Sequence, residues 1–131
     1  MVRPDERDLA GQAGSGSLLD QLRLLQDSGL VHVEVAWRDH PLWSPFIRRL
    51  REACPQLLVG AASVVQREAL AELADLDLRY AMSPCWDPIL LDQARRQGIL
   101  LVPGVFSPTE VMQAIRCGCR LVKLFPAATL G

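Results

Sequence analysis

Three stretches near the end of the chain, Ile99-Leu100-Leu101-Val102, Ser107-Pro108-Thr109-Glu110 and Leu121-Val122-Lys123-Leu124-Phe125-Pro126-Ala127, form one strand–helix–strand unit. The first and the last are short apolar runs, which predict buried strands. The middle stretch is a capping box with Pro at the first helical position, so it predicts where a helix begins. Short strands separated by a helix predict a parallel pair.

The same alternation extends back toward the N-terminus. Apolar runs that predict strands begin near residues 31, 57, 79, 99 and 121, and the later ones recur at about 20–22 residues. Amphipathic helices are predicted over about 18–28, 42–53, 66–75, 87–97 and 107–117. Regular βα units with connections this short favour a (β/α) barrel or a compact open sheet.

The length of the chain limits how much of a barrel it can form. A complete barrel has eight strands and usually about 250 residues, whereas this chain has 131. Five strands are clear, and Met1-Val2-Arg3 is a possible remnant of one more. We therefore predict one α/β domain over residues 1–131, a parallel TIM-barrel type with about five to six of eight βα units, short at both ends. Residues 1–16 hold few apolar side chains and are predicted to be flexible.

Composition excludes several classes of protein. The chain is 50% hydrophobic and 22% charged with a net charge of -1, which is typical of a globular protein without general affinity for nucleic acid or anionic membranes. It has no run of 18 apolar residues, and its N-terminus is too polar for a secretory signal. The four cysteines form no CxxC pair, so we expect reduced, mostly buried thiols, no metal site and a cytoplasmic protein.

Lys123 is the one charged residue in its apolar stretch. Strand alternation puts Lys123 and Phe125 on the same face. Burial disfavours an ammonium ion, and a neutral amine can attack a carbonyl carbon. Two structural alternatives remain open: a lysine at the strand end that reaches water, or one half of a buried ion pair.

Glu34 is predicted to point into the barrel. In the strand over residues 31–36, Val31, Val33 and Val35 share a face that suits the helix layer, which turns His32 and Glu34 toward the interior. A carboxylate there costs several kcal/mol unless it is paired or protonated. Glu34 is then either the structural ion partner of Lys123 or a general acid/base beside an amine nucleophile, and the two roles are compatible.

Further polar and special residues follow the strand ends, where ligands bind in parallel α/β folds. Arg38 could clamp a carboxylate, although an exposed loop arginine is the commoner case. Ser63 and Ser83 could serve only as helix caps. A Lys and a Glu at one rim with an Arg nearby indicate Schiff-base chemistry on a keto acid.

The motifs resemble those of the 2-keto-3-deoxy-6-phosphogluconate (KDPG) / 4-hydroxy-2-oxoglutarate (KHG) aldolase family. Glu34-Val35-Ala36-Trp37-Arg38 is similar to that family's E-V-T-x-R, and Val59-Gly60-Ala61-Ala62-Ser63-Val64 to its V-G-A-G-T-V. Ser83-Pro84, Val102-Pro103-Gly104 and Lys123-Leu124-Phe125-Pro126-Ala127 resemble its S-P-G, I-P-G and K-x-F-P-A. The motifs occur in one order at matching spacing from about Leu22 to the C-terminus.

The resemblance implies a class I pyruvate aldolase built as a trimer of (β/α)8 barrels. Lys123 would form the Schiff base and Glu34 would transfer protons. Arg38 and Ser63 would hold the substrate carboxylate, and Pro84 and Phe125 would shape the apolar wall around the pyruvyl group. The reaction would cleave a 2-keto-4-hydroxy acid to pyruvate and an aldehyde, glyceraldehyde 3-phosphate or glyoxylate, without metal or organic cofactor.

The sequence departs from the family at several positions. Ala36 replaces a Thr, Ala62 replaces the second Gly of G-A-G-T, and Cys85 replaces the Gly of S-P-G. The family's last two strands, which carry its Gly-rich phosphate-binding loops, are absent. A second hypothesis is therefore a non-catalytic truncated barrel, either an assembly or binding module or an inactive fragment. We expect the 131-residue chain to self-associate and to act weakly, if at all, on phosphorylated substrates.

Overall fold

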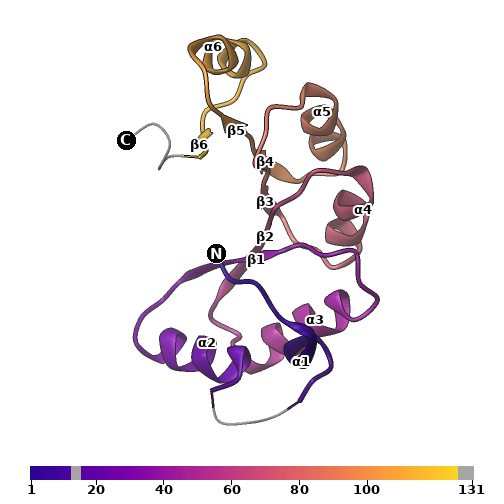
Figure 1. Ribbon diagram of the computed structural model, residues 1–131, viewed down its shortest axis with the longest axis vertical. Helices are drawn as coiled ribbons and strands as arrows, with labels where there is room; N and C mark the ends of the chain where they lie inside the picture. The colour runs from indigo at the N-terminus through magenta and orange to yellow at the C-terminus, as the bar shows by residue number, and fades with distance from the viewer. Residues whose placement is uncertain (13–15, 127–131) are drawn as a thin grey trace.

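A computed structural model describes residues 1–12 and 16–126 (Figure 1). The helices are α1 (Glu6–Leu9), α2 (Leu18–Asp27), α3 (Trp43–Ala53), α4 (Arg67–Asp75), α5 (Pro88–Arg96) and α6 (Pro108–Arg116). The strands are β1 (His32–Ala36), β2 (Leu58–Ala62), β3 (Tyr80–Met82), β4 (Leu100–Val102), β5 (Gly104–Val105) and β6 (Lys123–Leu124). In the part of the chain that the structure describes, no helix is long and apolar enough to cross a membrane.

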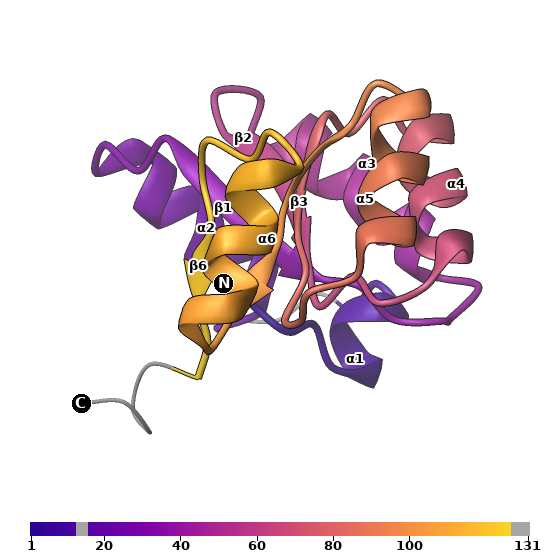
Figure 2. The same cartoon turned by 90° about the horizontal axis from the view of Figure 1, so that it is seen from above.

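The strands form a parallel series that runs through the molecule. β1, β2, β3 and β4 pair in that order, and β5 pairs with β6 in a second small sheet. Val2 adds a parallel bridge to Val35 at the other edge, as expected for a strand remnant before β1. Helices α3, α4 and α5 lie together on one side of the strands (Figure 2). The predicted fold, a partial parallel (β/α) barrel, is confirmed.

Pro103 and Gly104 turn the strand series from one sheet into the next. Proline has no N–H to donate, so the ladder between β3 and β4 stops there and its last carbonyl, that of Val102, accepts from Ser83. A Cβ on Gly104 would lie 2.5 Å from the backbone of Pro84, so only glycine allows this close approach. Beyond the turn, β5 is free to pair with β6.

The hydrophobic core lies between the strands and the outer helices. Val33 and Val35 of β1 point into it, as predicted, and α3 contributes Trp43, Phe46 and Ile47. The prediction for Val31 is wrong, because this residue precedes β1 and is 52% exposed. The Trp43 indole N–H donates to the carbonyl of Ala36 at 2.9 Å, which satisfies the one polar atom that this large side chain buries. Burial on this scale fixes β1 and the start of α3 against each other.

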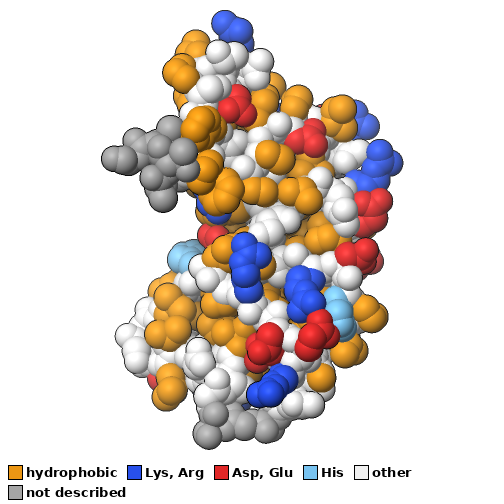
Figure 3. Space-filling view, viewed as in Figure 1, with side chains coloured by type: hydrophobic (Ala, Val, Ile, Leu, Met, Phe, Trp, Pro, Cys, Tyr) orange, Lys and Arg blue, Asp and Glu red, His pale blue; other side chains and the backbone are white. Residues whose placement is uncertain are grey.

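The opposite face of the strands is open. Leu58, Leu100 and Leu121 are exposed by 53%, 62% and 56%, and Phe125 by 42%. Figure 3 shows hydrophobic side chains gathered over the region of β4 to β6. The prediction of a buried strand over residues 121–127 is therefore wrong for residues 121–126, because no described element packs over its inner face; Ala127 lies outside the described residues.

The N-terminal segment contains an element that the sequence analysis did not predict. Asp5 caps α1 in a capping box with Asp8, and Leu9 is buried against the core. Arg49 of α3 donates to the carbonyls of Asp8 and Leu9 at 2.9 and 3.2 Å. These contacts hold residues 5–9 in place, whereas residues 13–15 of the stretch predicted to be flexible lie outside the described residues.

The cysteines differ in part from expectation. All four are free thiols, but only Cys54 is buried; Cys85 is exposed, and Cys117 and Cys119 are half-buried. Burial raises the pKa of the Cys54 and Cys119 thiols. The prediction of mostly buried thiols is thus wrong, because Cys85 lies in a loop beyond β3 and the other two lie at the end of α6.

Gly60 and Tyr80 form a matched pair on the inner face. Glu34 of β1 lies opposite Gly60 of β2 in the parallel register. The Tyr80 ring of β3 fills the space over Gly60, so a Cβ there would lie 2.2 Å from the ring. The Tyr80 hydroxyl reaches the carbonyls of Val33 and Leu58 at 3.0 and 3.1 Å.

We predict that Gly60→Ala destabilises the protein by about 1–3 kcal/mol, the usual cost of an added methyl group in a packed site. Adding Tyr80→Leu should recover most of this loss, because the smaller side chain vacates the space above Gly60. Chemical denaturation of both single variants and the double variant measures the coupling. Strictly additive losses would contradict the steric explanation.

Candidate active site

Backbone hydrogen bonds connect the strand ends into one rim. The Trp37 N–H donates to Ala62 at 2.9 Å, and the Val64 N–H donates to Met82 at 3.1 Å. The pairing continues from Ser83 N–H to Val102 at 3.0 Å and from Lys123 N–H to Pro103 at 2.8 Å. This backbone pairing joins the segments that follow β1 to β4 with the start of β6, which carries Lys123, along one edge. Glu34 lies within β1, two residues before its end.

Lys123 lies at the start of β6 and is half-buried. Its Nζ is 5.0 Å from the centroid of the Phe125 ring, so the two side chains share a face, as alternation predicted. A cation at this distance from an aromatic face is attracted to it. The ring thus holds the amine on the face of the strand that carries Phe125, although the burial of Lys123 is only partial.

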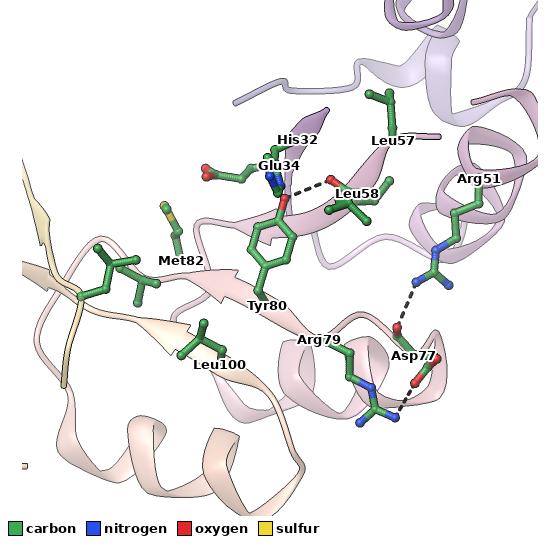
Figure 4. A pocket seen from close by; sticks show the side chains of 13 residues that line it. His32, Glu34, Arg51, Leu57, Leu58, Asp77, Arg79, Tyr80, Met82 and Leu100 are labelled. Carbon is green, nitrogen blue, oxygen red and sulfur yellow. Dashed lines mark hydrogen bonds and ion pairs between the residues drawn. The ribbon is translucent and has the colours of Figure 1, made fainter. Parts of the chain in front are cut away.

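Glu34 faces the interior from β1 (Figure 4). A cavity of about 570 Å³ lies against the inner faces of the strands, and its lining includes His32, Glu34, Tyr80, Met82, Val102 and Leu121. Burial, with the charge of Glu34 as a second cause, raises the pKa of Tyr80. Glu34 from β1 and Leu121, two residues before Lys123, therefore line the same hollow.

The structural ion pair considered for Glu34 and Lys123 is absent. Among residues 1–12 and 16–126, neither side chain has an oppositely charged partner within 4.0 Å. Glu34 lines the inner cavity, whereas the amine of Lys123 lies beside the Phe125 ring.

Arg38 follows β1 and is engaged by the N-terminal segment. One terminal nitrogen donates to a Glu6 carboxylate oxygen at 2.6 Å, and the other donates to the Pro4 carbonyl at 3.2 Å. The hydrogen bond from Arg38 holds the pKa of Glu6 below its ordinary value. Glu6 is therefore ionised at neutral pH, and this contact is lost only as the pH falls through the lowered pKa.

Ser63 has a backbone conformation that is unusual for a side-chain-bearing residue. Its φ is +58°, in the left-handed region. The alternative role considered for Ser63, that of a helix cap only, does not apply, because Gln66 is the N-cap of α4. Ser83 does not cap α5 either, since Asp87 does so. Non-glycine residues in this region concentrate at functional sites.

Pro84 lies in a tight loop after β3. The Ser83 side chain is buried, and its hydroxyl donates to the Cys85 carbonyl at 3.2 Å across Pro84. Gly104 packs directly against the Pro84 backbone. These contacts fix Pro84 at the rim between β3 and the β4–β5 turn. Cys85, where the family pattern has Gly, is exposed at the same rim.

Three contacts around the rim were not predicted from sequence. The position of Tyr80 beside Glu34 could have been predicted, because the sequence places an aromatic residue and a glycine on adjacent strands. Glu72 of α4 accepts from the Trp37 indole at 2.8 Å and from the Ser44 hydroxyl, which ties the loop after β1 to α4. The contact of Glu6 with Arg38 joins residues 32 positions apart and has no sequence pattern.

The sequence profile described as "KDPG and KHG aldolase" matches residues 14–131. The chain belongs to this family. The same segments that carry the rim, from β1 through β6, fall inside the match, so the resemblance of the short motifs extends to most of the chain.

Curated relatives agree with this assignment. The chain is 33% identical to a probable 2-dehydro-3-deoxy-6-phosphogalactonate aldolase of Rhizobium meliloti over 82% of this chain and 50% of the relative. It is 35% identical to a 2-dehydro-3-deoxy-phosphogluconate aldolase of Pseudomonas aeruginosa over 87% of this chain and 51% of the relative. The chain thus spans about half the length of these relatives.

Solved structures of the family share the fold. A KDPG aldolase from Legionella pneumophila, with pyruvate captured as a covalent carbinolamine intermediate, superposes with a TM-score of 0.77 at 26% identity. The superposition covers 100% of this chain and 59% of that protein. The KDPG aldolase of Zymomonas mobilis ATCC 29191 gives a TM-score of 0.76 at 25% identity, over 99% of this chain and 58% of that protein.

The left-handed backbone conformation of Ser63 leads to a prediction about the stability of its variants. Ser63→Gly should be neutral or stabilising by up to about 1 kcal/mol, whereas Ser63→Val should destabilise by about 1–2 kcal/mol, since a branched Cβ is worst there. Asp77→Gly, at the same φ of +58°, is the matched control. Thermal unfolding measures all three, and a Val variant as stable as the parent would contradict the strain.

Proposed function

We propose that this chain is a class I aldolase that reversibly cleaves KDPG or KHG to pyruvate and glyceraldehyde 3-phosphate or glyoxylate. One observation carries the proposal: Lys123 is paired through its backbone with Pro103 at the rim and lies 5.0 Å from the Phe125 ring, in a chain that belongs to this aldolase family. Family resemblance further suggests a cytoplasmic homo-oligomer, a trimer.

The composition of the chain supports a chemical role for this lysine. Lys and Arg together number 14, and Lys123 is the only lysine. All the other residues in this count are arginines, whose side chains stay charged and cannot form an imine. An amine at this one position is what Schiff-base chemistry requires, whereas a purely structural cation could equally be an arginine.

In the proposed mechanism, the Lys123 amine adds to the C2 carbonyl of the keto acid, and loss of water gives a protonated imine. Glu34, directly or through a water molecule, removes the proton of the C4 hydroxyl. The C3–C4 bond then breaks, its electrons pass into the imine to give an enamine, and the aldehyde leaves. Protonation at C3 and hydrolysis of the imine release pyruvate and restore the amine.

The remaining rim residues are proposed to orient the substrate. Arg38 and Ser63 would hold its carboxylate, since a guanidinium and a hydroxyl are both donors. Pro84 and Phe125 would pack against the pyruvyl group. Their places beside successive strand ends support this assignment, because one small molecule at the rim is within reach of several loops.

A second candidate is a non-catalytic barrel remnant that serves as an assembly or binding module or is an inactive fragment. Two observations favour it: Lys123 is only half-buried, and the inner face carries exposed leucines. It predicts that no imine forms on Lys123, whereas the aldolase requires one. The first experiment below therefore separates the two.

We predict that pyruvate with borohydride adds one reduced pyruvyl group to Lys123. The single lysine makes the assay clean, because the only competing amine is the N-terminus. Intact mass should show one adduct on the parent and none on Lys123→Arg, which keeps a cation at the position. No adduct on the parent, or equal labelling of the variant, would exclude the aldolase mechanism.

We predict that Glu34→Gln slows exchange of the pyruvate C3 protons with solvent by about 10²–10⁴-fold while leaving borohydride trapping at Lys123 nearly unchanged. Removing a general base affects proton transfer, not the preceding addition of the amine. Proton NMR in deuterated water measures the exchange, with Glu52→Gln on α3 as the charge-matched control. Unchanged exchange together with higher stability would make Glu34 a structural charge only.

A further inference from the structure

Glu6 of α1 is held by two donors from the loop after β1. One carboxylate oxygen accepts from Arg38 at 2.6 Å, and the other lies 3.2 Å from His40 Nε2. The Leu42 N–H donates to His40 Nδ1 at 3.0 Å, so Nδ1 is the acceptor and Nε2 carries the proton. Each carboxylate oxygen thus has its own donor, the arrangement expected for a bound carboxylate (Figure 3 shows acidic, basic and His side chains gathered over α1).

The position of Glu6 does not depend on this contact. Upstream, the Val2 N–H donates to the Glu34 carbonyl and the Val2 carbonyl accepts from Ala36, both at 2.8 Å. Downstream, Leu9 is buried and Arg49 holds the end of α1. Residues 2–9 are therefore anchored at both ends, and Glu6 is presented to Arg38 by the backbone.

We propose that Glu6 is an internal carboxylate that occupies Arg38 and that a keto-acid substrate must displace, so that Glu6 sets the affinity of the site for carboxylates. This inference rests on the proposed function, in which Arg38 holds the substrate carboxylate. A substrate carboxylate and Glu6 would compete for the same end of one guanidinium group. In this structure its two terminal nitrogens donate hydrogen bonds to Glu6 and to the Pro4 carbonyl.

The exposure of the pair sets the size of the effect. The Glu6 side chain is 69% exposed and that of Arg38 38% exposed. Water competes strongly at such sites, so exposed ion pairs are weak and exchange readily. Glu6 therefore lowers the apparent affinity for a keto acid only several-fold and does not block the site. Removing its charge frees Arg38 without disturbing the anchors at Val2 and Leu9.

The test is reductive trapping at Lys123 over a range of carbonyl concentrations, read by intact mass. Pyruvate is compared with acetone, which replaces the carboxylate by a methyl group. We expect Glu6→Gln to lower the half-saturating pyruvate concentration about 3–10-fold and to leave that of acetone unchanged. Glu52→Gln, exposed on α3, should match the parent with both compounds. Thermal unfolding checks that Glu6→Gln stays folded.

Several results would overturn the inference. An unchanged pyruvate response shows that Glu6 does not compete, and a weaker one shows that it orients Arg38 for the substrate. A gain of equal size with acetone shows that the effect does not involve the carboxylate. In each case the parent still forms an adduct, so the proposed aldolase function survives.

A second experiment measures pyruvate binding without imine formation. In a Lys123→Ala background, pyruvate binding is followed by line broadening of its methyl resonance, with and without Glu6→Gln. Tighter binding in the double variant supports the inference even if the parent forms no adduct and the aldolase proposal fails. Equal or absent binding in both backgrounds overturns it.

Discussion

The site depends on the parallel backbone pairing that continues past the ends of the strands. Each strand-end loop donates to, or accepts from, the next one, from Trp37 and Ala62 to Lys123 and Pro103. Backbone hydrogen bonds of this kind fix the position of a residue at the rim independently of its side chain. The side chains then need only the correct face, which strand alternation supplies.

Packing in the molecule is divided between its two faces. The outer side, between the strands and α3, α4 and α5, is closely packed, whereas Leu58, Leu100 and Leu121 are exposed on the inner side. Leaving one large apolar side chain in water instead of burying it forgoes about 1.5–3 kcal/mol. The outer core therefore stabilises the rim, while Glu34 on the open inner face and the half-buried Lys123 stay within reach of water.

Local sequence patterns predicted the helices and strands well because their causes are local. The capping box of Ser107 and Glu110 and the Asp87 cap before Pro88 are present in the structure. The burial of the Lys123 strand was predicted wrongly, because burial depends on what packs opposite, which the stretch itself does not encode. The Glu6–Arg38 pair was missed for a different reason: two exposed charges far apart in sequence carry no periodicity.

The position of Tyr80 is intermediate between the features that local sequence predicts and those that it does not, because it follows from strand register. Register brings Glu34 opposite Gly60, and Tyr80 covers Gly60 from the next strand. The glycine is thus required by an aromatic ring that forms one side of the space next to Glu34. Because the hydroxyl of the ring is anchored to carbonyls of β1 and β2 at once, the ring holds a fixed position in the lining that these strands share with Val102 of β4 and with Leu121.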